Sequence, residues 1–134
     1  MASALRRKVR ERADNRCEYC RISQDDVPHF PFHVEHIIAR KHGGKSRLDN
    51  LCWSCHLCNW FKSSNLSGID PVTGKVVRLF HPRRQEWSDH FDWSGPRLVG
   101  LTPSGRATIA VLRINLRHRM RTRRYLIAAG LFPA

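Results

Sequence analysis

The sequence has no apolar run long enough to cross a membrane, and its N-terminal stretch has no hydrophobic segment of the kind found in signal peptides. It also has no internal repeat and no low-complexity segment. We therefore expect a cytoplasmic protein with no membrane partner. Its 134 residues, of which 41% are hydrophobic, suit one modest core that carries an extension.

Acidic residues are scarce, with 11 Asp and Glu against 24 Lys and Arg, which gives a formal net charge of +13. Of the 24 basic residues, 19 are arginine, whose planar fork binds phosphate in a bidentate manner. A GC-rich genome would also favour arginine, but it does not explain the net charge. The charge predicts a nucleic-acid partner, contacted mainly through its phosphate backbone, over a membrane surface.

Hydrophobic periodicity and turn residues predict a mixture of short helices and strands. The expected helices cover residues 3–14, 54–64, 104–113 and 115–129, and the expected strands and hairpins cover residues 32–41, 68–82 and 91–102. Thr102 and Pro103 suit the start of a helix, as a capping side chain and a first-turn proline.

Five cysteines in a sequence without a leader are not expected to form disulfides, and their spacing is typical of a metal site. Cys17 and Cys20 form one C-x-x-C unit, whereas Cys52, Cys55 and Cys58 form two overlapping units. Four thiolates from two such units would bind a structural Zn²⁺ in a tetrahedral arrangement. Zinc chemistry by itself leaves open which of the overlapping units takes part.

Three separated motifs, "EHI" at 35–37, "DNL" at 49–51 and "CHLCNWFK" at 55–62, together resemble the HNH endonuclease family. The resemblance covers about residues 14–64 and is to the form of the family in which paired zinc knuckles brace a ββα-metal fold. In that family the asparagine of the second motif lies five residues before the first cysteine of the second knuckle, as Asn50 lies before Cys55. The resemblance therefore implies that the zinc ligands are Cys17, Cys20, Cys55 and Cys58, with Cys52 a small buried thiol.

The expected fold class is α+β, with a ββα-metal (His-Me finger) nuclease core braced by the four-cysteine zinc site. We expect two domains. Residues 1–66 would form the HNH core with its N-terminal helix and knuckles, and residues 67–134 would form a basic extension of β-hairpin and helices packed on the core.

The resemblance also implies roles for four side chains in phosphodiester hydrolysis. His36 would be the general base, and Glu35 and Asn59 would hold a catalytic divalent metal. Asn50 would fix the loop around His36 by hydrogen bonds. The family more often has aspartate at the position of Glu35, and Asn59 stands where histidine also occurs. We therefore expect Mg²⁺ or Mn²⁺ at this site, with Zn²⁺ confined to the cysteines.

Basic residues near the motif and in the last helix are the candidate nucleic-acid contacts. Lys62 lies three residues after Asn59, where it would hold a phosphate or lie on an exposed helix turn. The others recur every three or four residues and predict one basic helix face, either a DNA-backbone clamp or a solvated outer face: Arg113, Arg117, Arg121 and Arg124. Leu112, Leu116 and Met120 predict the apolar stripe of the same segment.

The leading hypothesis is a metal-dependent DNA endonuclease, which nicks or cleaves duplex DNA. The alternatives are a zinc-braced nucleic-acid-binding module without cleavage activity, and a nuclease that acts on RNA or only with a partner protein. One active site per chain implies one strand cut per binding event, and no dimer interface is evident in the sequence.

Overall fold

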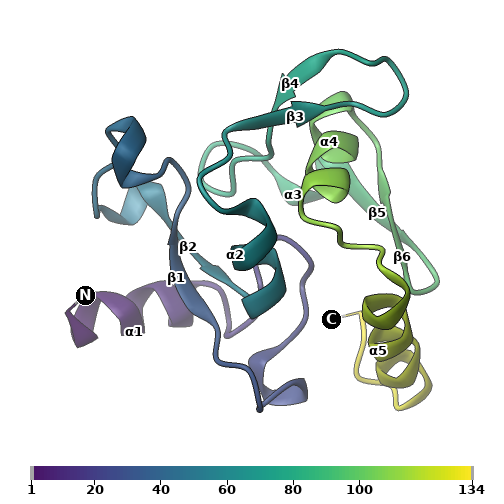
Figure 1. Cartoon of the computed structure of the whole chain (residues 1–134). Coiled ribbons are helices and arrows are strands. Elements are labelled where there is room, and N and C mark those ends of the chain that lie inside the picture. The colour runs from purple at the N-terminus through teal and green to yellow at the C-terminus, as the bar shows by residue number, and fades with distance from the viewer. Residues whose placement is uncertain (1, 134) are drawn as a thin grey trace.

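The computed structural model describes residues 2–133 and combines helices with three antiparallel hairpins (Figure 1). The order is α1 (Ser3–Arg12), β1 (His33–His36), β2 (Leu51–Ser54), α2 (His56–Lys62), β3 (Ser67–Ile69), β4 (Val76–Arg78), α3 (Trp87–His90), β5 (Phe91–Ser94), β6 (Arg97–Gly100), α4 (Pro103–Val111) and α5 (Arg117–Ala128). This is the α+β class that the sequence predicts.

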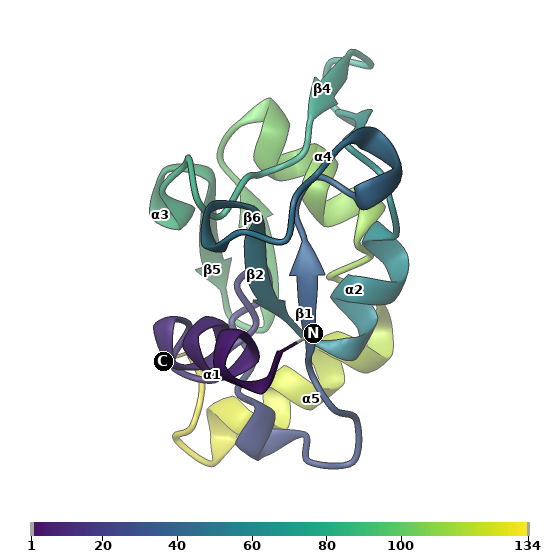
Figure 2. The same cartoon turned by 90° about the vertical axis from the view of Figure 1, so that its left-hand side faces the viewer.

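The β1–β2 hairpin lies between α1 and α2, as the two views at right angles show (Figures 1 and 2). Side chains of a strand alternate between its two faces, so adjacent residues of β2 face different helices. On one face the guanidinium of Arg6 in α1 lies 4.8 Å from the centre of the Trp53 ring. On the other face Glu35, which pairs with Cys52 in the β1–β2 register, contacts Lys62 of α2. The hairpin and α2 form the ββα unit that the motifs predict.

In the second half of the chain, α4 packs against both the β3–β4 and the β5–β6 hairpins. Its N-cap is Thr102, whose hydroxyl accepts a hydrogen bond from the amide of Gly105, and Pro103 is its first residue, as the sequence predicts. The carboxylate of Asp70 in the β3–β4 turn accepts two hydrogen bonds of 2.9 Å from Arg106. Thr108 accepts a 2.8 Å bond from the amide of Phe80, which ties α4 to the segment after β4.

Buried hydrophobic residues of both halves belong to one cluster. Tyr19 is its main link, because its ring meets Phe80 edge-on and its carbonyl accepts a 2.8 Å hydrogen bond from Trp87. Arg83 forms an ion pair with Glu18 close by. The second half therefore packs on the first, while its separation at residue 67 into a domain of its own stays a prediction.

The C-terminal helices are shorter than the sequence predicts. α4 ends at Val111 and α5 begins only at Arg117, so the expected helix over 115–129 loses its first two residues. Between them Arg113 takes a left-handed conformation with φ of 49°. This breaks the continuous helical face on which the predicted row of arginines depends. None of the helices within residues 2–133 is long and apolar enough to span a membrane.

Candidate active site and metal centre

His36 lies at the end of β1 and is half-buried, with its Nε2 2.8 Å from the hydroxyl oxygen of Ser46. Burial lowers the pKa of His36 and the charge of Arg40 lowers it further, while the carboxylate of Glu35 acts in the opposite direction. The net effect is a pKa below the usual value. A lowered pKa favours the neutral imidazole, which is the form that a general base needs.

Asn50 is buried and bridges the two ends of the loop that follows β1. Its Oδ1 accepts a 2.9 Å bond from the amide of Ile38, and its Nδ2 donates to the carbonyls of Ile38 (3.0 Å) and Lys45 (2.9 Å). The loop approaches itself so closely here that a Cβ on Gly44 would lie 1.7 Å from the Ile38 carbonyl oxygen. These bonds fix the backbone next to His36, which is the contact that the resemblance implies for Asn50.

Glu35 is buried, with 5% of its surface exposed, and its carboxylate is surrounded by protein groups. Its Oε2 accepts hydrogen bonds from the Tyr19 hydroxyl (2.7 Å) and the Cys52 thiol (2.9 Å). Its Oε1 lies 3.2 Å from the ammonium nitrogen of Lys62. The expected buried thiol of Cys52 thus has a partner that the sequence did not reveal.

Lys62 is not the surface contact that the sequence predicts. It is 2% exposed, and its ammonium donates a 2.9 Å bond to the carbonyl of Ile37 beside the ion pair with Glu35. A side chain enclosed in this way cannot reach a phosphate outside the fold. Neither an exposed helix turn nor an exposed phosphate contact fits this burial, because the position of Lys62 in the motif does not show which side chains pack against it.

The two side chains that the resemblance implies as ligands of a hard divalent cation, Glu35 and Asn59, lie on β1 and α2. Glu35 Oε1 is buried and receives no hydrogen bond with acceptable geometry, although Lys62 is near. Asn59, half-buried on α2 one turn before Lys62, makes no side-chain hydrogen bond within the described residues 2–133. A carboxylate and a carboxamide oxygen fit the ligand preference of Mg²⁺. The Lys62 ammonium already supplies a positive charge at this carboxylate and would compete with such an ion.

The second cluster is the set of four cysteines that the resemblance implies: Cys17, Cys20, Cys55 and Cys58. All four are buried, and their sulfur atoms lie within 4.8 Å of one another. The Cys20 and Cys55 sulfurs are 3.7 Å apart, close to the edge of about 3.8 Å in a tetrahedron with Zn–S bonds of about 2.3 Å. The donor set and its size therefore fit a structural Zn²⁺.

In each C-x-x-C knuckle, the backbone amide of the second cysteine points to the sulfur of the first. The amide of Cys20 points to the sulfur of Cys17 at 3.5 Å, and the amide of Cys58 points to the sulfur of Cys55 at 3.4 Å. Cys55 is also the N-cap of α2, so the second knuckle and the start of that helix are one structure. The cysteine cluster thereby sets the position of α2, and with it the position of Asn59.

Arg119 of α5 reaches the cysteine cluster from the far end of the sequence. Its Nη2 donates to the sulfur of Cys58 at 3.0 Å and to that of Cys55 at 3.8 Å. Burial alone would lower the pKa of Arg119, but the thiolate charges of Cys58, Cys20 and Cys55 outweigh it and raise that pKa above its usual value. A permanently charged guanidinium thus lies against the cluster.

The predicted faces of the last helix need correction. Leu112 and Leu116 precede α5, and the fully buried positions of α5 are Arg119 and Arg123 instead of an apolar stripe. Arg113 lies outside the helix, with its guanidinium 5.2 Å from the centre of the Phe61 ring. The exposed arginines that remain on the helix are Arg117, Arg121 and Arg124.

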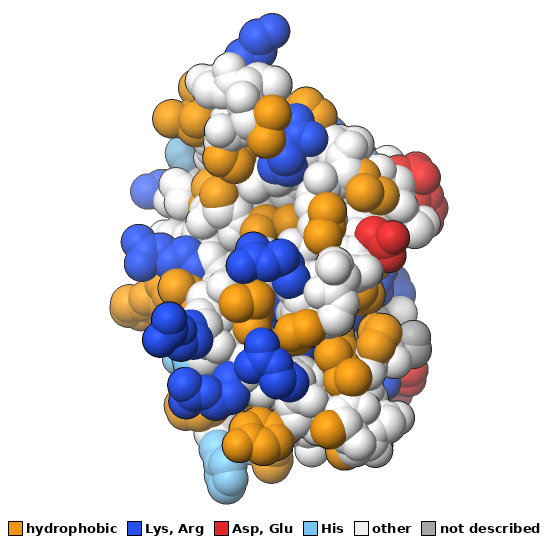
Figure 3. All heavy atoms as spheres, turned by 90° about the vertical axis from the view of Figure 1, so that its right-hand side faces the viewer, with side chains coloured by type: hydrophobic (Ala, Val, Ile, Leu, Met, Phe, Trp, Pro, Cys, Tyr) orange, Lys and Arg blue, Asp and Glu red, His pale blue; other side chains and the backbone are white. Residues whose placement is uncertain are grey.

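Figure 3 shows the face of the molecule that contains α5. Lys and Arg side chains gather over the left and centre of its lower half, and the few acidic side chains lie along the right-hand edge. Basic side chains therefore gather on the face that contains α5, where Arg117, Arg121 and Arg124 are exposed.

Three contributors to these sites were not found from the sequence: Tyr19, Ser46 and Arg119. Tyr19 lies inside the first knuckle, and its place between two metal ligands was the only available signal. Ser46 and Arg119 carry no signal in a single sequence, because each acts on a group that only folding brings near.

Comparison with known families gives a match to the HNH endonuclease family over residues 17–64. No curated protein and no solved structure gave a match to the chain. The matched segment begins at the first cysteine of the cluster and includes β1, β2 and all of α2. Residues 17–64 of this chain are therefore an HNH endonuclease family domain within an α+β fold.

Proposed function

We propose that this protein is a metal-dependent endonuclease that hydrolyses DNA phosphodiester bonds and acts in the cytoplasm. The HNH domain supports a nuclease in general and a nucleic acid as its substrate. The observation that carries the proposal is the environment of His36, an imidazole that contacts Ser46 beside a loop held in place by Asn50, and whose pKa is lowered by burial.

His36 would take the proton from the attacking water. When Nε2–H donates to the Ser46 hydroxyl, the lone pair on Nδ1 is free to accept that proton. The water oxygen then bonds to phosphorus, the bond from phosphorus to the 3′ oxygen breaks, and the 3′ oxygen takes a proton from solvent water, which leaves a 5′-phosphate and a 3′-hydroxyl. Ser46 holds the ring orientation during the transfer, and Asn50 holds the backbone from which the ring extends.

Glu35 and Asn59 would hold Mg²⁺ or Mn²⁺ through their side-chain oxygens. When bound, the ion would neutralise charge on the phosphate and on the departing oxygen. Tyr19 and Cys52 orient the Glu35 carboxylate by bonding its other oxygen. Lys62 balances the charge of that carboxylate within the fold.

The exposed arginines of α5 would contact the DNA backbone, with Arg113 beside them. Such contacts add affinity without reading sequence. A single chain would cut one strand in each binding event.

A zinc-braced binding module without cleavage is the second candidate. One observation favours it. The buried Lys62 ammonium lies beside Glu35 and balances the charge of this carboxylate, so the carboxylate does not need a catalytic metal to be stable in the fold.

The test is cleavage by purified protein of supercoiled plasmid, linear duplex, single-stranded DNA and RNA, each with Mg²⁺, Mn²⁺ or Zn²⁺. We expect nicking of supercoiled DNA with Mg²⁺ or Mn²⁺, and no cleavage by His36→Ala, which should bind DNA as the wild type does. Binding without cleavage under all conditions would favour the module, and activity with Zn²⁺ alone would contradict the metal assignment. Cleavage of RNA only would retain the chemistry and change the substrate.

A further inference from the structure

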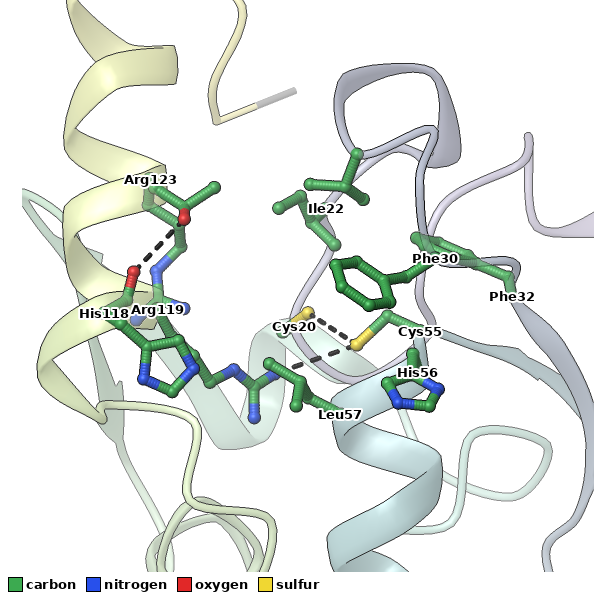
Figure 4. Close-up of a pocket in the computed structure, with 12 residues that line it drawn as sticks. Cys20, Ile22, Phe30, Phe32, Cys55, His56, Leu57, His118, Arg119 and Arg123 are labelled. Atoms are coloured by element: carbon green, nitrogen blue, oxygen red, sulfur yellow. Dashed lines mark hydrogen bonds between the residues drawn. The ribbon is translucent and has the colours of Figure 1, made fainter.

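The contact between α5 and the HNH domain depends on charge more than on apolar packing. Figure 4 shows Arg119 extending from α5 toward Cys55 and Cys20, across a pocket lined by Ile22, Phe30 and Leu57. This cavity of about 390 Å³ separates much of the helix from the knuckles. Because apolar side chains do not fill the gap, burial of hydrophobic area contributes little to holding the helix here.

Arg119 and Arg123, one helical turn apart, are 5% and 2% exposed. Backbone carbonyls accept hydrogen bonds from each guanidinium: Arg119 donates to the carbonyl of Leu112 (2.8 Å) and Arg123 to that of Pro96 (2.7 Å). Neither forms an ion pair with a carboxylate within residues 2–133. A buried charge without a counter-charge is costly, so an anion must lie near both.

The thiolate charges of the cysteine cluster act on both arginines: they raise the pKa of Arg119, and they oppose the lowering of the pKa of Arg123 that burial causes. Four thiolates around one Zn²⁺ keep a net double negative charge, which two arginines balance in full. Arg119 contacts the sulfurs directly, and Arg123 lies one turn further along the same buried face. N–H groups that donate to a thiolate sulfur also stabilise the metal-bound form, because they stabilise the negative charge on sulfur and so disfavour protonation of the thiolate.

We propose that Arg119 and Arg123 are the counter-charge of the zinc–tetrathiolate centre, so that metal binding and the docking of α5 on the HNH domain depend on each other. This inference is independent of whether the protein cleaves DNA. By thermodynamic linkage, whatever α5 docking contributes to metal affinity the metal contributes equally to docking. The exposed Arg117, Arg121 and Arg124 lie on the same helix, so their position would follow the metal state.

The test compares zinc affinity and helix docking in wild type, Arg119→Met and a matched control, Arg121→Met. The control removes the same charge from an exposed position on the same helix. Zinc affinity is measured by competition with a chromophoric chelator, and docking by amide hydrogen exchange of residues 117–128 in the zinc-loaded proteins. We expect Arg119→Met to bind zinc about 10–100-fold more weakly and to exchange faster in α5, while exchange in α1 stays unchanged. Arg121→Met should match the wild type in both measurements.

A second variant, Arg119→Lys, keeps the charge and serves if the methionine variant does not fold. Lysine has one terminal nitrogen, which cannot occupy both positions from which Nη1 donates to the Leu112 carbonyl and Nη2 to the Cys58 sulfur. Zinc should therefore leave this variant faster than the wild type. Co²⁺ substitution gives a second readout, since the sulfur-to-cobalt charge-transfer bands should shift in both Arg119 variants. Zinc affinity and α5 exchange equal to the wild type in both variants would overturn the proposal.

Discussion

The two ends of α2 each carry a buried charge pair, and the pairs differ in how far apart their members lie in the sequence. At the C-terminal end Lys62 meets Glu35 of β1, within the matched segment. At the N-terminal end Cys55 and Cys58 meet Arg119, which follows Cys58 by 61 residues. The first pair belongs to the HNH motif itself. The second joins the motif to the extension, so the extension is a part of the metal centre's surroundings and not an independent appendage.

The largest expected effect is loss of the metal centre, which would break the N-terminal pair completely. Cys58→Ala should abolish zinc binding and cooperative folding, because a structural zinc supplies apparent binding energy of about 10–16 kcal/mol in small zinc domains. Cys52→Ala is the matched control, since Cys52 is equally buried but bonds Glu35. Thermal melts with metal analysis would check this. A protein that keeps zinc without Cys58 but loses it without Cys52 would reverse the ligand assignment.

The second-largest expected effect comes from breaking the ion pair between Lys62 and Glu35 at the C-terminal end of α2. Lys62→Met leaves the Glu35 carboxylate buried without a cation and should lower the free energy of unfolding by about 3–5 kcal/mol. Adding Glu35→Gln should recover part of that loss, because the double variant no longer buries an uncompensated charge. Urea unfolding of the four proteins in this cycle measures the coupling. Additive effects would mean that the two groups do not interact.

The two charge pairs also differ from the motifs in how well a single sequence predicts them. The β1–β2 hairpin, α2 and the four clustered cysteines followed from motifs of fixed spacing, and the structure brings those cysteines together. The faces of α5 did not follow, because the 3.6-residue period assigns buried positions to apolar side chains. Arg119 and Arg123 violate that rule since their counter-charge is a metal cluster assembled from residues far away. The position of Lys62 was predicted wrongly for a related reason, because its carboxylate partner lies on β1, which packs against α2 only in the folded protein.

A smaller effect concerns the pH dependence of cleavage. His36 must be neutral to accept a proton, and its pKa is lowered by burial and by Arg40. Activity should therefore fall as the pH decreases through a midpoint below the usual histidine value of about 6.5. Single-turnover rates between pH 5 and pH 8, with DNA binding measured at each pH as the control, give the midpoint. A midpoint above the usual value would contradict the assignment of His36 as a base depressed in this way.

The smallest expected effect is on DNA affinity. Reversing the charge of Arg117 and Arg121 to glutamate should weaken binding to all sequences and reduce the salt slope of log K by about 1 for each lost phosphate contact. Arg7→Glu with Arg10→Glu makes the same change in net charge on exposed positions of α1. Equal losses in both double variants would assign the affinity to net charge and remove the role of α5.

The most direct measurement is the initial rate of plasmid nicking at saturating DNA with Mg²⁺, for the wild type and His36→Ala at equal DNA occupancy. A general base contributes about 10²–10⁴-fold to such a rate, and we predict a loss of at least this size with unchanged binding. A variant that nicks at the wild-type rate would contradict the central claim that this imidazole activates the water.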